Sequence, residues 1–224
     1  MAADSISASW HQLHTELEGC SACPLRKECI GPVGWFGSGE SPLLIVGEGP
    51  GGVEDAYGCP LIGPSGQLLD KLLWAAHMTR DRIITSNVIK CRPLNNRTPT
   101  LEEGEFCANR WLLQEIRLLK PKVIVALGSV ALHYFLNPTA RITQSRGNWF
   151  KTRVDGVGDI DCIATYHPSY VLRQTGVARS KAKWQLFFDL EEAKNKAWEY
   201  VPGYSFDGGE PVKLFERFEK RTLG

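Results

Sequence analysis

Residues 43–52 read LLIVGEGPGG, an apolar run that ends at a glycine-rich turn. A short continuous apolar run of this kind is typical of a buried strand. Three further stretches predict strands, at 82–89 (RIITSNVI), 122–127 (KVIVAL) and 161–166 (DCIATY). Because helical patterns alternate with these stretches, the sequence predicts an α/β fold with a parallel sheet. Ligands of such folds bind beyond the carboxyl ends of the strands.

The predicted helices lie between and around these strands. Residues 66–77 have amphipathic spacing, and Thr100-Leu-Glu-Glu103 forms a capping box that opens a helix to about Leu119. Other helices are expected over 5–18, 129–136 and 180–199, a loop over 31–42, and a Gly-rich hairpin region over roughly 144–160. We expect one domain over residues 1–201. The tail, residues 202–224, is predicted to be either a short docked helix or a loose segment.

The composition excludes several classes of protein. With a formal net charge of +1, the chain as a whole is not strongly basic. Any contact with nucleic acid must therefore come from a local basic patch. The sequence MAADSISASW lacks the features of a signal peptide, and the longest apolar runs are too short to span a membrane. We therefore expect a cytoplasmic protein without a membrane partner. In a reducing cytosol, clustered cysteines indicate metal ligands rather than disulfides.

Four cysteines have the spacing of a metal cage. Cys20 and Cys23 form a C-x-x-C pair, whose sulfurs face one metal site, and Cys91 and Cys107 are separated by fifteen residues. Such a cage would tie the N-terminal segment to the middle of the fold. Four sulfurs suit zinc or an iron–sulfur cluster equally well. Of the other cysteines, Cys29 is a decoy candidate, and the rest (Cys59 and Cys162) are expected to be small buried residues.

Polar side chains stand at three of the predicted strand ends. Glu48 follows the first strand, Asn87 ends the second and His167 follows the fourth. Singly, each has a plainer explanation as part of a tight turn, a cap or a structural contact. Because the ends of parallel strands share one edge of the sheet, we expect a carboxylate, an amide and an imidazole to converge on one crevice. Together with the cysteine cage, this coincidence favours an active site.

Four long features give the chain a resemblance to a known family. They are GEGPGGVEDAYGCPLIGPSGQLLD (47–70), TSNVIKCRP (85–93), YHPSYVLR (166–173) and the cysteine spacing, with RGNWF (146–150) in support. The chain resembles the family-4 uracil-DNA glycosylases of the iron–sulfur type from about Cys20 to about Tyr200. The resemblance implies a three-layer α/β/α sandwich on a central four-stranded parallel sheet. It also implies a monomer whose cage, within residues 1–201, holds a [4Fe–4S] cluster in a structural role, with zinc as the runner-up.

The activity that the resemblance implies is removal of uracil from single- or double-stranded DNA. A monofunctional glycosylase of base excision repair flips the nucleotide out, hydrolyses its N-glycosidic bond and leaves an abasic site. Asn87 matches the residue that reads uracil against cytosine, and His167 matches the donor to uracil O2. Glu48 matches the residue that positions the attacking water and stabilises the cationic sugar. Backbone N–H groups from Gly47 to Gly49 are expected to add to the anion-binding surface.

Two further positions of the predicted pocket concern the pyrimidine ring. Glu54 matches a residue near uracil C5 that helps to exclude the methyl group of thymine; the alternative is a solvated turn formed with Asp55. Leu61 departs from the family, which has an aromatic residue there to stack on the base. Because a stacked aromatic contributes about 1–3 kcal/mol per base, we expect weaker uracil binding or a displaced base specificity.

The DNA contacts are expected from loops at the mouth of the pocket. Gly63 and Ser65 precede a helix whose N–H groups suit a phosphate. Between Arg141 and Lys183 there are eight Arg or Lys and three Asp, a local excess of positive charge that suits a DNA backbone. The remaining predicted contacts are Arg146 from this group and four residues that match the minor-groove loop of the family, in which Leu172 or Arg173 fills the gap left by the flipped base: Pro168, Ser169, Leu172 and Arg173.

Three alternative functions stay open from the sequence. The substrates could extend to hypoxanthine, xanthine or other deaminated bases, especially with Leu61 in the pocket. A covalent uracil-DNA binder would need a histidine in a basic loop after the second strand, and no histidine occurs between His77 and His133. A non-catalytic nucleotide- or cluster-binding module is disfavoured by the full set of Glu48, Asn87 and His167.

Overall fold

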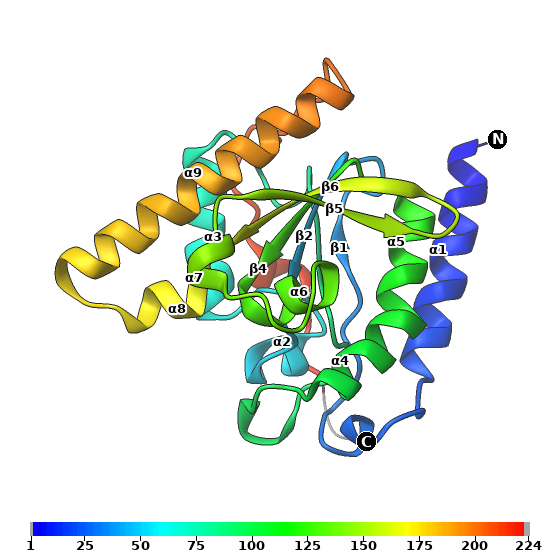
Figure 1. Cartoon of the computed structure of the whole chain (residues 1–224). Helices are drawn as coiled ribbons and strands as arrows, with labels where there is room; N and C mark the ends of the chain where they lie inside the picture. Colours follow the sequence, from blue (N-terminus) through cyan, green and yellow to red (C-terminus); the bar gives the residue numbers. More distant parts are fainter. Residues whose placement is uncertain (1, 222–224) are drawn as a thin grey trace.

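A computed structural model describes residues 2–221 of the chain, with side chains described from Ser9 to Arg221. One six-stranded sheet crosses the molecule, in the strand order β1-β3-β2-β4-β6-β5 (Figure 1). The prediction of parallel strands is confirmed for the four central ones, β3, β2, β4 and β6. The strands are β1 (Phe36–Gly37), β2 (Leu43–Gly47), β3 (Ile84–Asn87), β4 (Val123–Leu127), β5 (Trp149–Val154) and β6 (Gly158–Thr165).

The two edge strands are antiparallel to their neighbours. β5 forms a hairpin with β6, within the region predicted to be one, and β1 pairs with β3. The expectation of a loop over 31–42 is wrong for Phe36 and Gly37, which form β1. A strand of two residues is too short to show a periodic pattern, and it exists because β3 offers an open edge for pairing.

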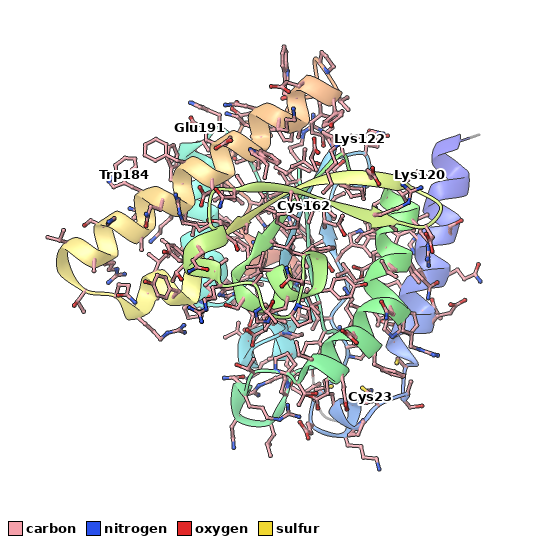
Figure 2. All side chains as sticks on the ribbon, viewed as in Figure 1. Cys23, Lys120, Lys122, Cys162, Trp184 and Glu191 are labelled. Atoms are coloured by element: carbon pink, nitrogen blue, oxygen red, sulfur yellow. The ribbon has the colours of Figure 1, made fainter. Side chains whose placement is uncertain are left out.

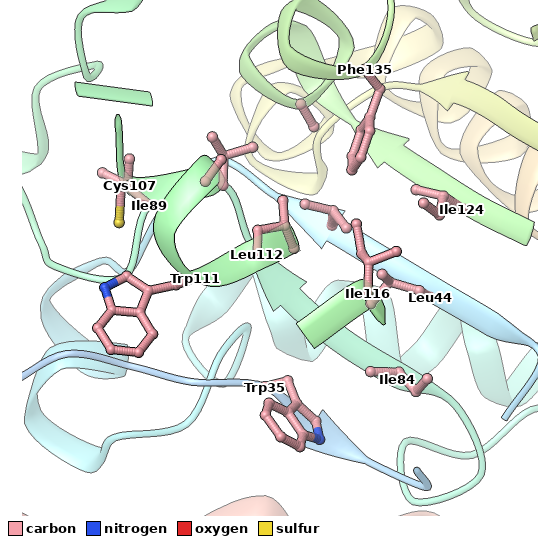
Figure 3. Close-up of a cluster of buried hydrophobic side chains, with 14 of the residues drawn as sticks. Trp35, Leu44, Ile84, Ile89, Cys107, Trp111, Leu112, Ile116, Ile124 and Phe135 are labelled. Carbon is pink, nitrogen blue, oxygen red and sulfur yellow. The ribbon is translucent and has the colours of Figure 1, made fainter. Parts of the chain in front are cut away.

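Helices cover both faces of the sheet, which makes the predicted three layers. Along β2, Leu44 and Val46 point into one core with residues of α1, α4 and α5, while Leu43 and Ile45 point into another with residues of α3 and α9. This alternation is the period of two of a strand. Figure 1 shows α1 and α5 on one side and α3 and α9 on the other, and Figure 3 shows part of the first core. The α-helices are α1 (Ala2–Glu18), α2 (Gly52–Tyr57), α3 (Pro64–Ala75), α4 (Leu101–Cys107), α5 (Leu113–Leu119), α6 (Gly128–Phe135), α7 (Ile142–Ser145), α8 (Pro168–Arg173), α9 (Gly176–Tyr200) and α10 (Leu214–Arg217).

The capping box at Thr100 is confirmed. Thr100 Oγ1 accepts the backbone N–H of Glu103 at 3.1 Å, and the Glu103 carboxylate accepts the N–H of Thr100 at 2.8 Å. The predicted single helix to Leu119 is divided by a π-helical turn, Ala108–Leu112, between α4 and α5. Such turns often accompany functional sites, and this one follows directly on Cys107.

The described part of the tail is docked on the rest of the fold. Of the two alternatives predicted for the tail, the structure confirms the short docked helix. Leu214 of α10 is buried, Phe218 packs edge-on against Phe36, and Phe215 packs edge-on against Tyr57. Arg221 donates from its guanidinium to the carbonyl of Pro32 at 3.0 Å. The tail therefore adds apolar area to the core near β1. None of the helices described between residues 2 and 221 is long and apolar enough to cross a membrane.

A buried ion pair lies under the carboxyl end of β3. Lys90 Nζ donates to Glu115 Oε2 at 2.7 Å, to Ser86 Oγ at 2.6 Å and to the carbonyl of Asn87 at 3.0 Å. The side chains of Lys90 and Glu115 are 1% and 2% exposed. The pair therefore joins α5 to the strand end that carries Asn87.

We predict that removing either partner of this pair destabilises the fold strongly. Lys90→Met or Glu115→Leu should each lower the free energy of unfolding by about 3–5 kcal/mol, because the remaining charge stays buried without its partner. The double variant should recover most of that loss. Urea unfolding of the two single variants and the double variant measures these free energies. A single variant whose free energy of unfolding lies within about 1 kcal/mol of the wild-type value would contradict the prediction.

Candidate active site

A cleft of about 580 Å³ opens at the carboxyl edge of the parallel strands. The turn after β2 contributes Glu48, the start of α6 directly after β4 contributes Gly128 and Ser129, and His167 follows the end of β6. The predicted convergence of the strand ends is therefore observed for Glu48 and His167. The same wall needs glycine at 128, since a Cβ there would lie 2.9 Å from the Cβ of His167 and φ is +83°.

Asn87 is the last residue of β3 but is not among the residues that line the cleft, so the predicted convergence is not observed for its side chain. Its side chain is buried, and neither Oδ1 nor Nδ2 has a hydrogen-bond partner among the described residues. A Cβ at Gly47 would lie 2.5 Å from Asn87 Oδ1 and 3.6 Å from a methyl of Leu61, so the amide and the cleft-lining Leu61 approach the same face of Gly47. A buried amide without partners is costly. A ligand with one donor and one acceptor would satisfy it.

His167 caps the N-terminus of α8 and is held in one tautomer. The backbone N–H of Ser169 donates to Nδ1 at 3.2 Å, and Ser169 Oγ lies 2.8 Å from the same nitrogen. Because Nδ1 accepts, the ring proton is on Nε2. Burial, reinforced by the positive charge of Arg173, lowers the pKa of His167 to about 4. The ring is therefore neutral at physiological pH and has an N–H donor on Nε2.

Glu48 is half-buried on the cleft wall. Burial raises the pKa of its carboxyl group, and the opposite charge of Arg173 works against that rise. Arg173, at the end of α8, lines the same cleft. One guanidinium therefore favours the charged form of Glu48 and the uncharged form of His167.

Glu54 lines the cleft but is no solvated residue. It is 8% exposed, and its carboxylate accepts the backbone N–H groups of Gly51 at 3.1 Å, Ile62 at 3.1 Å and Gly63 at 2.8 Å. The solvated-turn alternative is thus wrong for Glu54, and also for Asp55, which is 2% exposed. Glu54 fixes the segment that carries Leu61, whose φ of 54° lies in the left-handed region.

The residues predicted to contact DNA fall into three groups. Ser65, Ser169 and Arg173 line the cleft, and Gly49 does as well. Pro168 is buried and Leu172 is half-buried on α8, while the Gly63 N–H is already used by Glu54. Arg146 lies elsewhere: its guanidinium contacts the Asp189 carboxylate of α9 at 3.0 Å.

The sequence analysis missed several residues of the cleft. Asn96, Arg97 and Thr98 line it from the loop between β3 and α4, and Tyr166 stacks against Tyr170 with ring centres 4.5 Å apart. The available signal was their position, because a loop after a parallel strand borders the ligand-binding edge.

The four predicted metal ligands gather at one end of the first core. Cys20 and Cys23 follow α1, Cys91 lies in the loop after β3, and Cys107 ends α4. Cys107 interacts electrostatically with the two thiols of the C-x-x-C pair, and Cys91 with Cys23 and Cys107. The backbone N–H of Lys90 points at Cys107 Sγ, 3.3 Å away. The Cys29 thiol donates to the carbonyl of Arg26 at 3.7 Å, and the neighbouring Cys91 lowers the pKa of Cys29 to about 7.

This donor set fits a cluster of several iron atoms. The described residues hold no group of three or more His, Cys, Asp or Glu arranged around a single ion. The thiols come from three segments, have apolar neighbours such as Trp111, and receive a backbone N–H, all of which suit such a cluster. Cys23 lies at the same end of the molecule as the loop after β3 (Figure 2). The other expected buried cysteines, Cys59 and Cys162, are indeed fully buried.

Comparison with known proteins gives one family. Residues 34–191 match the family model of the Uracil DNA glycosylase superfamily. The chain is 40% identical to a type-4 uracil-DNA glycosylase of Thermotoga maritima over 79% of this chain and 88% of the relative. It is 38% identical to one of Pyrobaculum aerophilum (73% and 84%) and 35% identical to one of Archaeoglobus fulgidus (70% and 80%).

We predict that nitrogen-15 NMR will show His167 as the neutral Nε2–H tautomer with a pKa of about 4. Arg173→Gln should raise that pKa, because a positive charge that opposes protonation is lost, but burial should keep it below the ordinary value of 6.5. The exposed Arg153→Gln is the matched control and should leave the titration unchanged. A ring that titrates near 6.5 in the wild type would contradict the tautomer and burial described above.

Proposed function

The chain belongs to the uracil-DNA glycosylase superfamily and to its type-4 group, and from this premise we propose that it removes uracil from DNA. It flips the nucleotide out of the strand, hydrolyses the N-glycosidic bond and leaves an abasic site for base excision repair. The observation that carries the proposal is the Asn87 amide, buried without a partner among the described residues, together with a cleft lined by Glu48 and His167.

In this proposal Asn87 selects the base. Uracil presents N3–H as a donor and O4 as an acceptor, and a fixed carboxamide offers the complementary acceptor and donor. Cytosine reverses that order, so its binding would leave two buried polar pairs mismatched. The side chain is held ready because Lys90 binds its backbone carbonyl and Gly47 leaves room for its oxygen.

His167 stabilises the leaving group. Breaking the N-glycosidic bond places negative charge on the uracil ring, including O2. The proton on Nε2 of a neutral imidazole donates to that oxygen without having to leave the ring. Since the low pKa keeps His167 neutral, it adds no positive charge that would attract the carboxylate of Glu48.

Glu48 acts on the sugar side. An ionised carboxylate positions the attacking water and stabilises the cationic sugar. Burial raises the pKa of Glu48 above its ordinary value, and His167 titrates only near pH 4. Because Glu48 acts as a carboxylate, its protonation at low pH should lower the activity.

The pocket wall decides how broad the substrate range is. Glu54, locked by three backbone N–H groups, occupies the wall where the resemblance puts uracil C5 and the methyl group of thymine. Leu61 has no π-face to offer the base. This residue favours a second candidate activity, on hypoxanthine, xanthine or other deaminated bases, beside or in place of uracil.

We further propose that Cys20, Cys23, Cys91 and Cys107 hold a [4Fe–4S] cluster. Its chemistry when bound is structural. The four thiolates join the segment after α1 to the loop after Asn87 and to the end of α4. Cys91 is four residues from Asn87, so this link restrains the strand end that reads the base. Ser65, Ser169 and Arg173 at the cleft mouth are the proposed DNA contacts, and the proposed active unit is a monomer over residues 1–201 with the tail docked on it.

The assay that tests the function uses oligonucleotides with U, hypoxanthine, xanthine or T, followed by alkaline strand cleavage. We expect excision of uracil and none of thymine. His167→Ala should lower kcat by about 10²–10³-fold, the loss found when one donor to a developing anion is removed. Glu48→Gln and Asn87→Ala should also lose most activity, and the exposed Glu40→Gln should not.

Three results would reject the proposal. One is strand cleavage equal for uracil and thymine. Another is full activity of Asn87→Ala on uracil. The third is an SDS-stable protein–DNA adduct in place of turnover, which indicates covalent trapping.

A separate measurement tests the cluster. Protein purified without air should contain about four iron and four sulfide per chain, as the cluster formula requires. Cys107→Ser should lose most of both and melt at a lower temperature, whereas Cys162→Ser, buried in β6, should keep them. Cys29→Ser tests whether Cys29 is a ligand of the cluster or only a neighbour of the ligands. We expect this variant to keep the iron content of the wild type. Zinc without iron in the wild type would contradict the cluster.

A further inference from the structure

The first half of α9 exposes a stripe of large side chains. Val177, Lys181, Trp184 and Phe188 recur at helical spacing on the side opposite the buried Ala182, Leu186 and Leu190. Trp184 is 58% exposed and Phe188 is 55% exposed. Figure 2 shows Trp184 on the outer side of this helix, which projects from the body of the molecule. Apolar rings so exposed are usually part of a binding surface.

The rings of this stripe form a fixed platform. Trp184 and Phe188 stack with centroids 5.8 Å apart and an interplanar angle of 26°. Phe187 packs edge-on against both, at 5.6 Å and 5.4 Å, and its other side lies on the apolar core. Two nearly parallel ring faces are thus held at the surface by a third ring that is anchored below.

The half of α9 that carries the platform is cationic. Lys181 stands within the stripe, whereas Arg179 and Lys183 fall on the other side of the helix at 3.6 residues per turn. Residues 173–188 contain Arg173, Arg179, Lys181 and Lys183 and no acidic residue. No ion pair is found for these four cations within residues 2–221. Acidic residues begin immediately afterwards with Asp189, Glu191 and Glu192, so the cationic half of α9 has a sharp end (Glu191 is labelled in Figure 2).

The helix that carries the platform follows closely in the chain on a helix that borders the cleft. Arg173 lines the cleft at the end of α8, and two residues separate it from Gly176, where α9 begins. Trp184 lies eight residues beyond Gly176, which is about 12 Å along a helix. At the rise of a DNA strand this corresponds to about three to four nucleotides. A strand that leaves the cleft past Arg173 and follows α9 would pass Trp184 about three to four nucleotides beyond the start of the helix.

We propose that single-stranded DNA flanking the flipped nucleotide binds along this half of α9, with bases stacked on Trp184 and Phe188 and a phosphate on Lys181. The proposal rests on the proposed function, and it assigns unpaired DNA as the preferred flank. Base faces are accessible to stacking only when the strand is unpaired, and stacking on aromatic rings within a cationic track is how single strands are bound without sequence preference.

The charge pattern favours a nucleic acid over a protein partner. The centres of protein interfaces are depleted of lysine, whereas here Lys181 stands within the stripe between Val177 and Trp184. Phosphates and bases use both kinds of side chain at once. The acidic residues after Phe188 bound the track on the side away from the cleft.

The test measures fluorescence anisotropy with single-stranded DNA that lacks uracil, so it does not depend on excision. The variant Trp184→Ala/Phe188→Ala should raise Kd at least about fivefold. Trp198→Ala, which removes another exposed tryptophan from the acidic half of the same helix, should leave Kd unchanged. Annealing a complementary strand should abolish the difference between the double variant and the wild type. Lys181→Gln should lower the slope of log K against log salt by about 0.7.

Excision kinetics supply the second measurement. For uracil with long single-stranded flanks, the double variant should raise KM and leave kcat unchanged. With about three nucleotides on each side, too few to reach the platform, it should match the wild type. If the wild type excises uracil but the double variant binds single-stranded DNA as tightly as the wild type, the platform is rejected and the proposed function stands. If the double variant binds more weakly but the wild type excises no uracil, the proposed function is rejected and the platform stands.

One more result would overturn the platform. In this result Trp184→Ala leaves the affinity for DNA unchanged but dissociates a dimer in analytical ultracentrifugation or abolishes binding to anionic vesicles. The stripe would then bind a second copy of the chain or a membrane surface rather than DNA.

Discussion

The buried pair of Lys90 and Glu115 is the interaction on which the position of Asn87 depends. The ammonium group binds Glu115 and Ser86, and it also binds the carbonyl of Asn87 at 3.0 Å. The backbone N–H of Val88 donates to Gly47, and that of Ile89 donates to Glu48, so the ends of β2 and β3 are joined. An amide whose own polar atoms have no protein partner would otherwise turn toward water. Here these hydrogen bonds hold the backbone that carries it.

Burial does opposite things to the two titratable groups of the cleft. Loss of water disfavours charge, which raises the pKa of Glu48 and lowers the pKa of His167. The positive charge of Arg173 lowers both pKa values, so it opposes the rise for Glu48 and adds to the fall for His167. One cation therefore keeps a carboxylate usable and an imidazole neutral, and this is the division of roles that cleavage of an N-glycosidic bond needs. Arg173 also lies close in the chain to α9, which begins at Gly176.

Particular residues show how far the sequence could be interpreted. The strand ends at Glu48 and His167 were predicted to meet, because parallel strands order their carboxyl ends along one edge. Arg146 was predicted to contact DNA from its charge and its motif, yet it lies against Asp189, and its DNA role stays a prediction. The Gly63 N–H was expected to be free for a phosphate, but Glu54 accepts it. In both cases the hydrogen-bond partner lies in another segment of the chain, and a local sequence pattern cannot predict such a partner.

The sequence by itself determined the four parallel strands, the capped helix at Thr100 and the family, since each is written in contiguous apolar runs, local capping or long motifs. Only the tertiary structure decided that β1 pairs with β3, that Glu54 is locked rather than solvated, and that Asn87 lacks a partner among the described residues. The physical reason is range. Propensity and periodicity act over a few neighbouring residues, whereas burial and hydrogen-bond partners depend on segments that meet only when the chain has folded.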